Sequence, residues 1–116
     1  MTNWTTLPHE NLTAYKVARE LVVIVREAKI SDAKLRDQAM RAATSACLNI
    51  AEAAGRTSAA DKARVYGIAR GEGCEAVAAL DVAAAAGWCR AEAARSAPAA
   101  GSQLYAMLTA LSRKAG

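Results

Sequence analysis

The residues best suited to catalysis in this sequence are two carboxylates, Glu72 and Glu75. Their i, i+3 spacing places them on one face of a helix, where paired carboxylates can serve acid–base catalysis or bind a metal. The second carboxylate pair and the Glu-x-x-His motif of a di-iron site do not accompany them. The single histidine, His9, stands outside any Cys or carboxylate cluster, so we expect it to be solvated. The sequence contains no nucleophile elbow, Walker loop or dinucleotide fingerprint. We therefore expect no enzymatic activity, no catalytic or metal-binding residue and no cofactor.

A second polar set lies within the alanine-rich stretch RAATSACLNIAEAAGR, Arg41 to Arg56. At 100° per residue, one helical sector of roughly 80° contains Gln38, Arg41, Ser45, Asn49 and Glu52. Glu52 and Arg56 have the favourable acid-first i, i+4 order for an ion pair. The sector is either a solvated outer stripe or a partly buried junction that bonds the following turn or an adjacent subunit. We expect Glu52 and Arg56 to fix that turn, with Asn49 supporting them.

The basic residues offer a different chemistry, which is electrostatic. The net charge of +4 and the pI of about 9.2 permit binding to a polyanion without requiring it. Three or more cations on one face would follow a phosphate backbone, with an affinity that falls steeply with salt. The candidate nucleic-acid-binding positions are Lys16, Arg19, Arg26, Lys29, Arg36, Arg41, Arg64 and Arg70. Acidic residues are mixed among them, so the alternative is charge that only confers solubility. An aromatic content of 4% argues against recognition by base stacking.

The elements that must position these residues are four helices, because apolar residues recur with a 3.6-residue period and no strand alternation is present. The first helix follows Pro8, with Asn11 as its candidate N-cap. The second begins at Ser31 or Asp32, both good N-caps, and Gly55 supplies its C-terminal stop.

The third helix opens at Ser58 with Asp61 three residues later, a variant of the capping box, and ends at Gly87. The fourth has Pro98 in its first turn. Residues Arg90 to Ala97 could form a short preceding helix or a loop. Long helices joined by short turns predict an all-α protein, an antiparallel up-down-up-down four-helix bundle.

Composition indicates that this bundle has a thin core. Residues 1–116 fit a single domain, in which 1–10 form an N-terminal lead-in. Hydrophobic residues make up 53% of the chain, but many are alanines and there is no Phe. The apolar arc of the first helix covers about 180°, wider than the usual ~100° stripe. Burial between subunits would compensate for the thin core, so we expect a homo-oligomer.

No stretch approaches the roughly 20 apolar residues that span a bilayer. The N-terminus, MTNWTTLPHENL, lacks the pattern of a signal peptide. We therefore expect no membrane association and a cytoplasmic location. Cys47, Cys74 and Cys89 form no CxxC pair, so we expect three small buried hydrophobic residues rather than disulfides or a zinc site.

The segment LRDQAMRAATSACLNIAEAAGR, from Leu35 to Arg56, resembles the signature of a bacterial four-helix-bundle family often encoded in intervening sequences of large-subunit ribosomal RNA genes. The matching positions are Gln38, Arg41-Ala42, Ser45, Asn49-Ile50-Ala51-Glu52 and Gly55-Arg56. A second block, YGIARGEGCEAVAAL, is similar to a later family block at Ile68, Ala69, Gly71 and Glu75. The resemblance covers about Leu12 to Trp88.

Two residues depart from the family pattern. Ala53 stands where the family usually has Gly, and Glu72 stands where it usually has Ser. The extra carboxylate at Glu72 weakens any role of this patch in phosphate binding. We expect Gly67 and Gly71, spaced by four, to permit a tight helix crossing rather than to form a phosphate loop, because such loops precede a helix.

The resemblance extends to the accessory variability protein of diversity-generating retroelements, whose relatives look like basic pentameric barrels. It therefore implies a pentamer and a partner protein such as a reverse transcriptase. We expect a non-enzymatic accessory protein that binds the backbone of RNA or DNA through a basic surface of the homo-oligomer. The alternative is a protein-binding scaffold with no nucleic-acid role.

Overall fold

Helices make up most of the chain in this computed structural model, which describes residues 5–115. Residues 1–4 of the expected lead-in lie outside the described residues. The helices are α1 Thr13–Ala28, α2 Ala33–Gly55, α3 Ala59–Ala85, α4 Ala91–Ala94 and α5 Ala97–Ala115. The described residues contain no strand. The region from Arg90 to Ala97 thus contains the single-turn helix α4 and a bend before α5.

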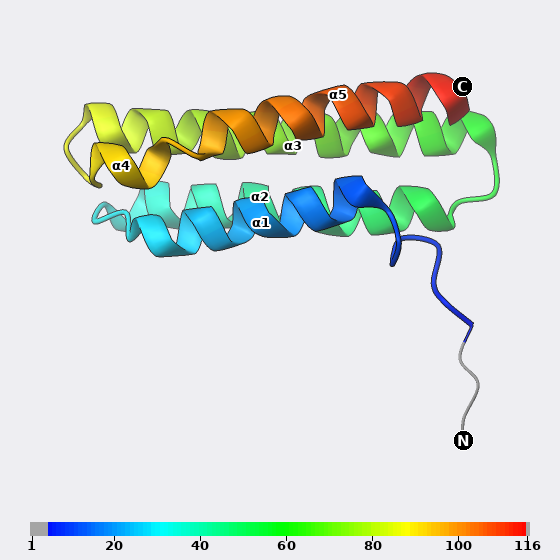
Figure 1. Cartoon of the computed structure of the whole chain (residues 1–116), viewed down its shortest axis with the longest axis horizontal. Coiled ribbons are helices and arrows are strands. Elements are labelled where there is room, and N and C mark those ends of the chain that lie inside the picture. Colours follow the sequence, from blue (N-terminus) through cyan, green and yellow to red (C-terminus); the bar gives the residue numbers. More distant parts are fainter. Residues whose placement is uncertain (1–4, 116) are drawn as a thin grey trace.

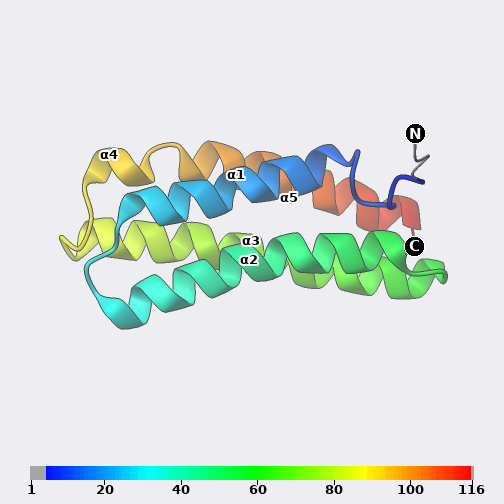
Figure 2. The same ribbon diagram turned by 90° about the horizontal axis from the view of Figure 1, so that it is seen from below.

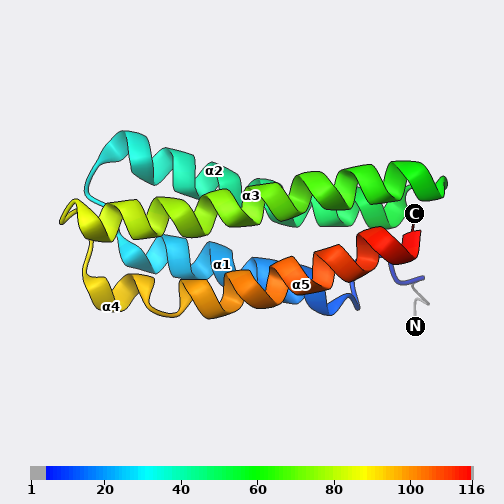
Figure 3. The ribbon, with the colours of Figure 1, turned by 90° about the horizontal axis from the view of Figure 1, so that it is seen from above.

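The four long helices form a bundle in which consecutive helices run in opposite directions (Figure 1). Helix α1 packs beside α2 and α5, and α3 packs beside the same two helices from the other side (Figures 2 and 3). The predicted all-α four-helix bundle is confirmed. One end of the bundle carries the α1–α2 turn, α4 and the C-terminus of α3. The other end carries the α2–α3 turn (Figure 1).

Two of the expected N-caps are present. The side chain of Asp32 accepts a hydrogen bond from the Leu35 backbone N–H at 3.0 Å. The Ser58 hydroxyl accepts one from the Asp61 N–H, also at 3.0 Å. Each bond satisfies a backbone donor that the first turn of a helix leaves unpaired.

The predicted start signal of α1 and the predicted stop signal of α2 act differently from the prediction. Asn11 does not cap α1; the N-cap is Leu12, which makes no side-chain cap bond and whose N–H donates to the His9 carbonyl at 3.0 Å. Helix α2 does end at Gly55, but not through a left-handed glycine. The chain leaves the helix because Arg56 is extended, with φ −74° and ψ 154°.

The C-terminus of α3 is closed by the glycine that the sequence predicted. Gly87 has a φ of +78°, its N–H donates to the Ala84 carbonyl at 3.1 Å, and the Trp88 N–H donates to the Ala83 carbonyl at 2.8 Å. This is a Schellman motif, for which glycine is favoured because it lacks a Cβ. The Trp88 carbonyl then accepts a hydrogen bond from the Ser31 N–H at 2.9 Å, which ties the end of α3 to the α1–α2 turn.

The core is thin, because more than half of its buried apolar residues are alanines. At the edges of the wide apolar arc on α1, Tyr15, Val22 and Ile24 pack against the core and stay half-exposed. The largest fully buried side chains are Leu21, Val25, Ile30, Ile50, Val65, Leu80, Leu104 and Leu108. No helix among residues 5–115 is long and apolar enough to cross a membrane.

The tight helix crossing expected at Gly67 and Gly71 is wrong within the chain. A Cβ built on either glycine would meet no heavy atom within 4 Å. The close approach lies instead between α3 and α5. There a Cβ on Gly101 would lie 2.6 Å from Val77 Cγ2, and one on Gly73 would lie 3.0 Å from Leu104 Cδ2.

Two further expectations need correction. Cys47 is buried as predicted and Cys89 is half-buried, but Cys74 is exposed. Burial raises the pKa of the Cys47 thiol above its ordinary value. His9 is not simply solvated: it is half-buried, and its ring packs edge-on against Tyr15 with 4.6 Å between centroids.

Candidate nucleic-acid interface and the α2–α3 junction

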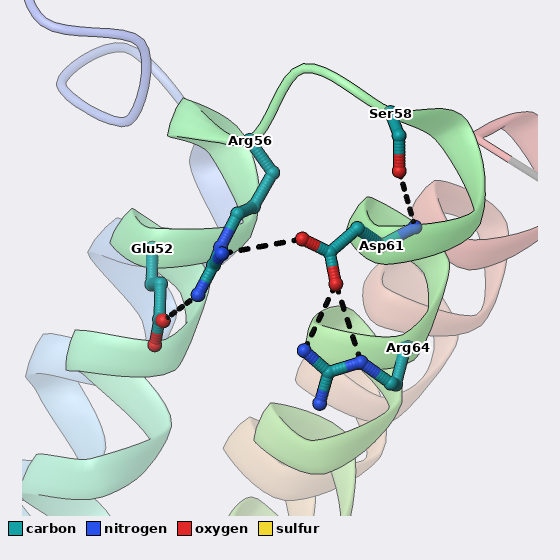
Figure 4. A network of polar contacts seen from close by, with 5 residues as sticks. All are labelled: Glu52, Arg56, Ser58, Asp61 and Arg64. Carbon is teal, nitrogen blue, oxygen red and sulfur yellow. Dashed lines mark hydrogen bonds and ion pairs between the residues drawn. The ribbon is translucent and has the colours of Figure 1, made fainter.

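The polar residues at the end of α2 form a charge network across the α2–α3 turn (Figure 4). The Arg56 guanidinium bonds Glu52 on its own helix and reaches Asp61 Oδ2 on α3 at 3.2 Å. Arg64 Nη2 donates to the other oxygen of Asp61 at 2.9 Å. Ser58 caps α3 at the same place. The four charges therefore alternate in sign from one helix to the next.

This network perturbs the ionisation of two of its members. The hydrogen bond from Arg64, with the nearby charges of Arg56 and Arg64, lowers the pKa of Asp61 against the opposing effect of partial desolvation. The hydrogen bond to Glu52, with the charges of Asp61 and Glu52, raises the pKa of Arg56. Each partner thus favours the charged form of the other at neutral pH. The side chains are partly exposed, between 31% and 60%, so solvent screens the charges and the network can orient the turn but adds little to overall stability.

The rest of the polar sector of α2 does not join this network. Asn49 is half-buried, and its side-chain amide donates to the Ser45 carbonyl at 3.0 Å on the same helix, rather than to Glu52 or Arg56. Arg41 is exposed, and its Nη2 lies 3.6 Å from Glu75 Oε2 on α3. The polar sector of α2 is therefore neither a fully solvated stripe nor a fully buried junction. Part of it, at Arg41, lines the seam between α2 and α3.

The two family-like blocks face each other along this seam. The first block, Leu35 to Arg56, covers most of α2 and its C-cap. The second contributes Glu75, half-buried beside Arg41, and the exposed Gly71. Within residues 5–115, no three His, Cys, Asp or Glu side chains are arranged to hold a metal ion.

Three of the candidate cations are already engaged with carboxylates. Arg26 lies 3.9 Å from Glu27, while Arg41 and Arg64 make the contacts described above. The others have no carboxylate within 4.0 Å in the described part of the chain; they are Lys16, Arg19, Lys29, Arg36 and Arg70. These are the cations most available to an external anion.

Two of these cations, Arg36 and Arg70, are held by other groups of the chain. Arg70 Nη1 donates to Thr109 Oγ1 at 3.0 Å, and its guanidinium lies 4.9 Å from the centre of the Tyr105 ring. Arg70 is half-buried between α3 and α5, so it is already oriented by the fold.

Three cations gather at the end of the bundle that carries the α1–α2 turn. Lys29 caps α1 in a left-handed conformation with φ 50°. Arg36 Nη1 donates to the Ile30 carbonyl at 3.1 Å, which holds its guanidinium at that turn. Lys29 and Arg90 both line a surface pocket of about 900 Å³ between the end of α1 and α4. We call Lys29, Arg36 and Arg90 the basic end.

Arg90 was not among the candidate cations predicted from the sequence. It follows Gly87-Trp88, and the bond between Ser31 and Trp88 brings this segment to the α1–α2 turn. Nothing in the local sequence signals that contact. The basic end is not uniformly positive, because Glu27 and Glu92 line the same pocket.

The fold, with the two family-like blocks side by side on α2 and α3, defines a small four-helix-bundle protein. The family model described as 23S rRNA-intervening sequence protein matches residues 10–110. The chain belongs to this family of 23S rRNA-intervening sequence proteins. No curated protein matches the sequence. The family description implies no catalytic role.

Proposed function

We propose that this chain is a non-enzymatic accessory protein that binds the backbone of RNA or DNA through a basic surface of a homo-oligomer. The observation that carries the proposal is the basic end, where the distant Arg90 joins Lys29 and Arg36 at the α1–α2 turn. The proposed location is the cytoplasm. A partner protein, such as a reverse transcriptase, would be recruited by the same oligomer.

The chemistry of the basic end suits phosphate rather than bases. Arg36 is fixed by its bond to the Ile30 carbonyl, and Lys29 and Arg90 flank a pocket with room for a phosphate and its sugar. Guanidinium and ammonium groups contact phosphates without reading sequence. Glu27 and Glu92 reduce the local field, so one copy would bind weakly. Repetition of the site in an oligomer would concentrate the charge of +4 per chain into a stronger field.

The test is a titration of the purified protein with generic duplex DNA and with structured RNA at about 50 and 200 mM salt. We expect log affinity to fall linearly with log salt. Replacing Lys29 and Arg90 with Gln should reduce the magnitude of the slope for duplex DNA by about 1 for each lost phosphate contact. The matched control replaces Arg113 and Lys114 with Gln, which removes the same charge from the end of α5. This control should leave the slope nearly unchanged.

Two outcomes would contradict the proposal. If both double variants lower the slope equally, binding follows net charge and the basic end is not the interface. If neither polymer binds at low salt, the nucleic-acid function fails. The protein-binding scaffold would then take its place, and a specific observation favours that alternative: Leu48 is 69% exposed and Ile68 is 43% exposed, so the bundle presents apolar side chains to a partner.

A further inference from the structure

The surface pocket between the C-terminal end of α1 and helix α4 is lined by charges of both signs. Helix α4 lies beside that end of α1 (Figure 2). The α1 wall of the pocket contributes Glu27 and Lys29, and the opposite wall contributes Arg90 and Glu92. Each wall therefore carries one cation and one carboxylate, with a single residue between them in the chain. We call Glu27 and Glu92 the pocket carboxylates.

The four charges of this pocket do not neutralise one another through ion pairs. In the described part of the chain, Lys29 and Arg90 have no carboxylate within 4.0 Å, and Glu92 has no basic group within that distance. Glu27 makes the loose 3.9 Å contact with Arg26. All four pocket residues are exposed. The carboxylates are thus free to accept hydrogen bonds from a ligand, and the cations are free to hold an anion.

The backbone that carries these charges is held on both walls. Lys29 is the C-cap of α1, and its N–H donates to the Arg26 carbonyl at 3.3 Å. The opposite wall follows the Schellman turn at Gly87, and the bond from the Ser31 N–H to the Trp88 carbonyl joins it to the α1–α2 turn. The pocket is therefore present before a ligand arrives, so binding has to order side chains rather than backbone.

The pocket has the size and the lining for one unit of a nucleic-acid backbone. Its volume of about 900 Å³ lies within the range of small-molecule sites. Apolar groups complete the lining: Ile24 and Cys89 are half-buried, and Ala28 is buried. A sugar ring can pack against these groups while its phosphate contacts the cations.

The two backbones that the proposed function allows differ in the one group that a carboxylate needs. An ionised carboxylate only accepts hydrogen bonds. An internal unit of a DNA backbone offers phosphate and ether oxygens, which are acceptors as well, so it meets a carboxylate with repulsion alone. An internal unit of an RNA backbone adds a 2′-hydroxyl, which can donate. Carboxylates beside phosphate-binding cations therefore oppose DNA, whereas RNA can satisfy them.

We propose that this pocket selects RNA over DNA. Lys29 and Arg90 hold a backbone phosphate, and a pocket carboxylate accepts a hydrogen bond from the 2′-hydroxyl of the adjoining sugar. Glu92 is the better placed of the two acceptors, because no cation of the described chain lies within 4.0 Å of it, whereas Glu27 is shared with Arg26.

The inference rests on the proposed function and names the polymer that the basic end binds. The cations supply affinity for either backbone, because phosphates are common to both. The pocket carboxylates supply the discrimination, because they weaken the contact with any backbone that has no donor to offer. This gives Glu27 and Glu92 a role in a site where a phosphate alone would only be repelled by them.

The test compares three end-labelled single strands of one sequence that contains only A, C and G, titrated at one salt concentration and followed by fluorescence anisotropy. The strands are RNA, DNA and RNA with 2′-fluoro sugars. The 2′-fluoro strand keeps the sugar pucker of RNA but has no hydroxyl to donate. We expect RNA to bind about two- to tenfold more tightly than DNA, which is the effect of one net hydrogen bond. The 2′-fluoro strand should bind like DNA.

Two double variants test the assignment to the pocket carboxylates. Glu27→Ala with Glu92→Ala removes both acceptors, so DNA should bind more tightly and the preference for RNA should disappear. The matched control, Glu20→Ala with Asp81→Ala, removes the same charge at exposed positions outside the pocket. It should raise both affinities alike and keep the wild-type ratio of RNA to DNA affinity. Circular dichroism checks that each variant is folded.

The outcomes separate this inference from the proposed function. Equal affinities of the wild type for RNA and DNA would overturn the inference and leave the proposed function standing. A 2′-fluoro strand that binds as tightly as RNA would also overturn it, because the preference would then follow the shape of the backbone. So would a folded pocket variant that keeps the full preference for RNA. If neither polymer binds at low salt, the proposed function and the inference fail together.

Discussion

The contact between α3 and α5 crowds Gly101 and leaves Gly67 uncrowded, so Gly→Ala substitutions at the two positions should have opposite effects on stability. In Gly101→Ala the new methyl group would lie 2.6 Å from Val77 Cγ2, closer than carbon atoms approach in proteins. Alanine gains about 1 kcal/mol over glycine in a helix interior. Overpacking against a stiff β-branched side chain costs about 1–3 kcal/mol. We therefore expect a net loss of about 1 kcal/mol, a fall of about 4 °C in Tm for a chain of this size.

The matched substitution is Gly67→Ala in the interior of α3, where the methyl group meets nothing within 4 Å. It should stabilise the protein by about 0.5–1 kcal/mol, because only the helix propensity changes. Thermal and urea denaturation followed by circular dichroism measure both, at one protein concentration. In a Val77→Ala background the clash disappears, so Gly101→Ala should become stabilising. If Gly101→Ala stabilises the wild type as much as Gly67→Ala does, α3 and α5 do not approach this closely.

The remaining predictions concern the charged turn and one buried phenol. Glu52→Gln should lower Tm by about 1–3 °C, because it removes the carboxylate charge that accepts the hydrogen bond of Arg56. An unchanged Tm with a lost ligand interaction would show that Glu52 serves function rather than the turn. The pKa of Asp61 is lowered in the folded protein, so its contribution to stability is present above its unfolded pKa, about 3.9, and is lost as the pH falls. Asp61→Asn should therefore be less stable than the wild type at pH 6, and the difference should shrink as the pH falls below about 3.9, as judged by urea denaturation. A difference that stayed constant in acid would argue against this titration. Burial raises the pKa of Tyr66, so stability from its neutral form is present below its unfolded pKa, about 10, and is lost as the pH rises through the folded value. Tyr66→Phe should flatten the alkaline limb of the stability profile, and a limb of unchanged steepness would assign the loss to other groups.

The polar network at the α2–α3 turn could be predicted from the sequence only in part. The spacing of Glu52 and Arg56 predicted their pairing, because i, i+4 neighbours meet on any helix. The bridge from Arg56 to Asp61 needs the angle at which the chain enters α3, which no local spacing encodes. Asn49 was expected to support the pair, but its side-chain amide donates to the Ser45 carbonyl one turn earlier on α2.

The basic end could not be predicted from sequence. Lys29 and Arg36 are close in the chain, but Arg90 joins them only because the Schellman turn at Gly87 directs the Trp88 carbonyl toward Ser31. Periodicity indicates which residues face outward from a helix. It does not indicate which outward residues of different helices become neighbours.

What the sequence determined by itself is local: the all-α class, the four long helices, the cap at Ser58, a cap at Ser31 or Asp32 and the glycine turn at Gly87. These follow from hydrogen bonds and apolar periodicity within a few residues. Only the tertiary structure decided which glycines are crowded. Gly71 faces open space and Gly101 meets Val77, although each is a glycine inside a helix. The physical reason is that close packing depends on the separation and rotation of two whole helices, which the summed contacts of the core set and no single motif encodes.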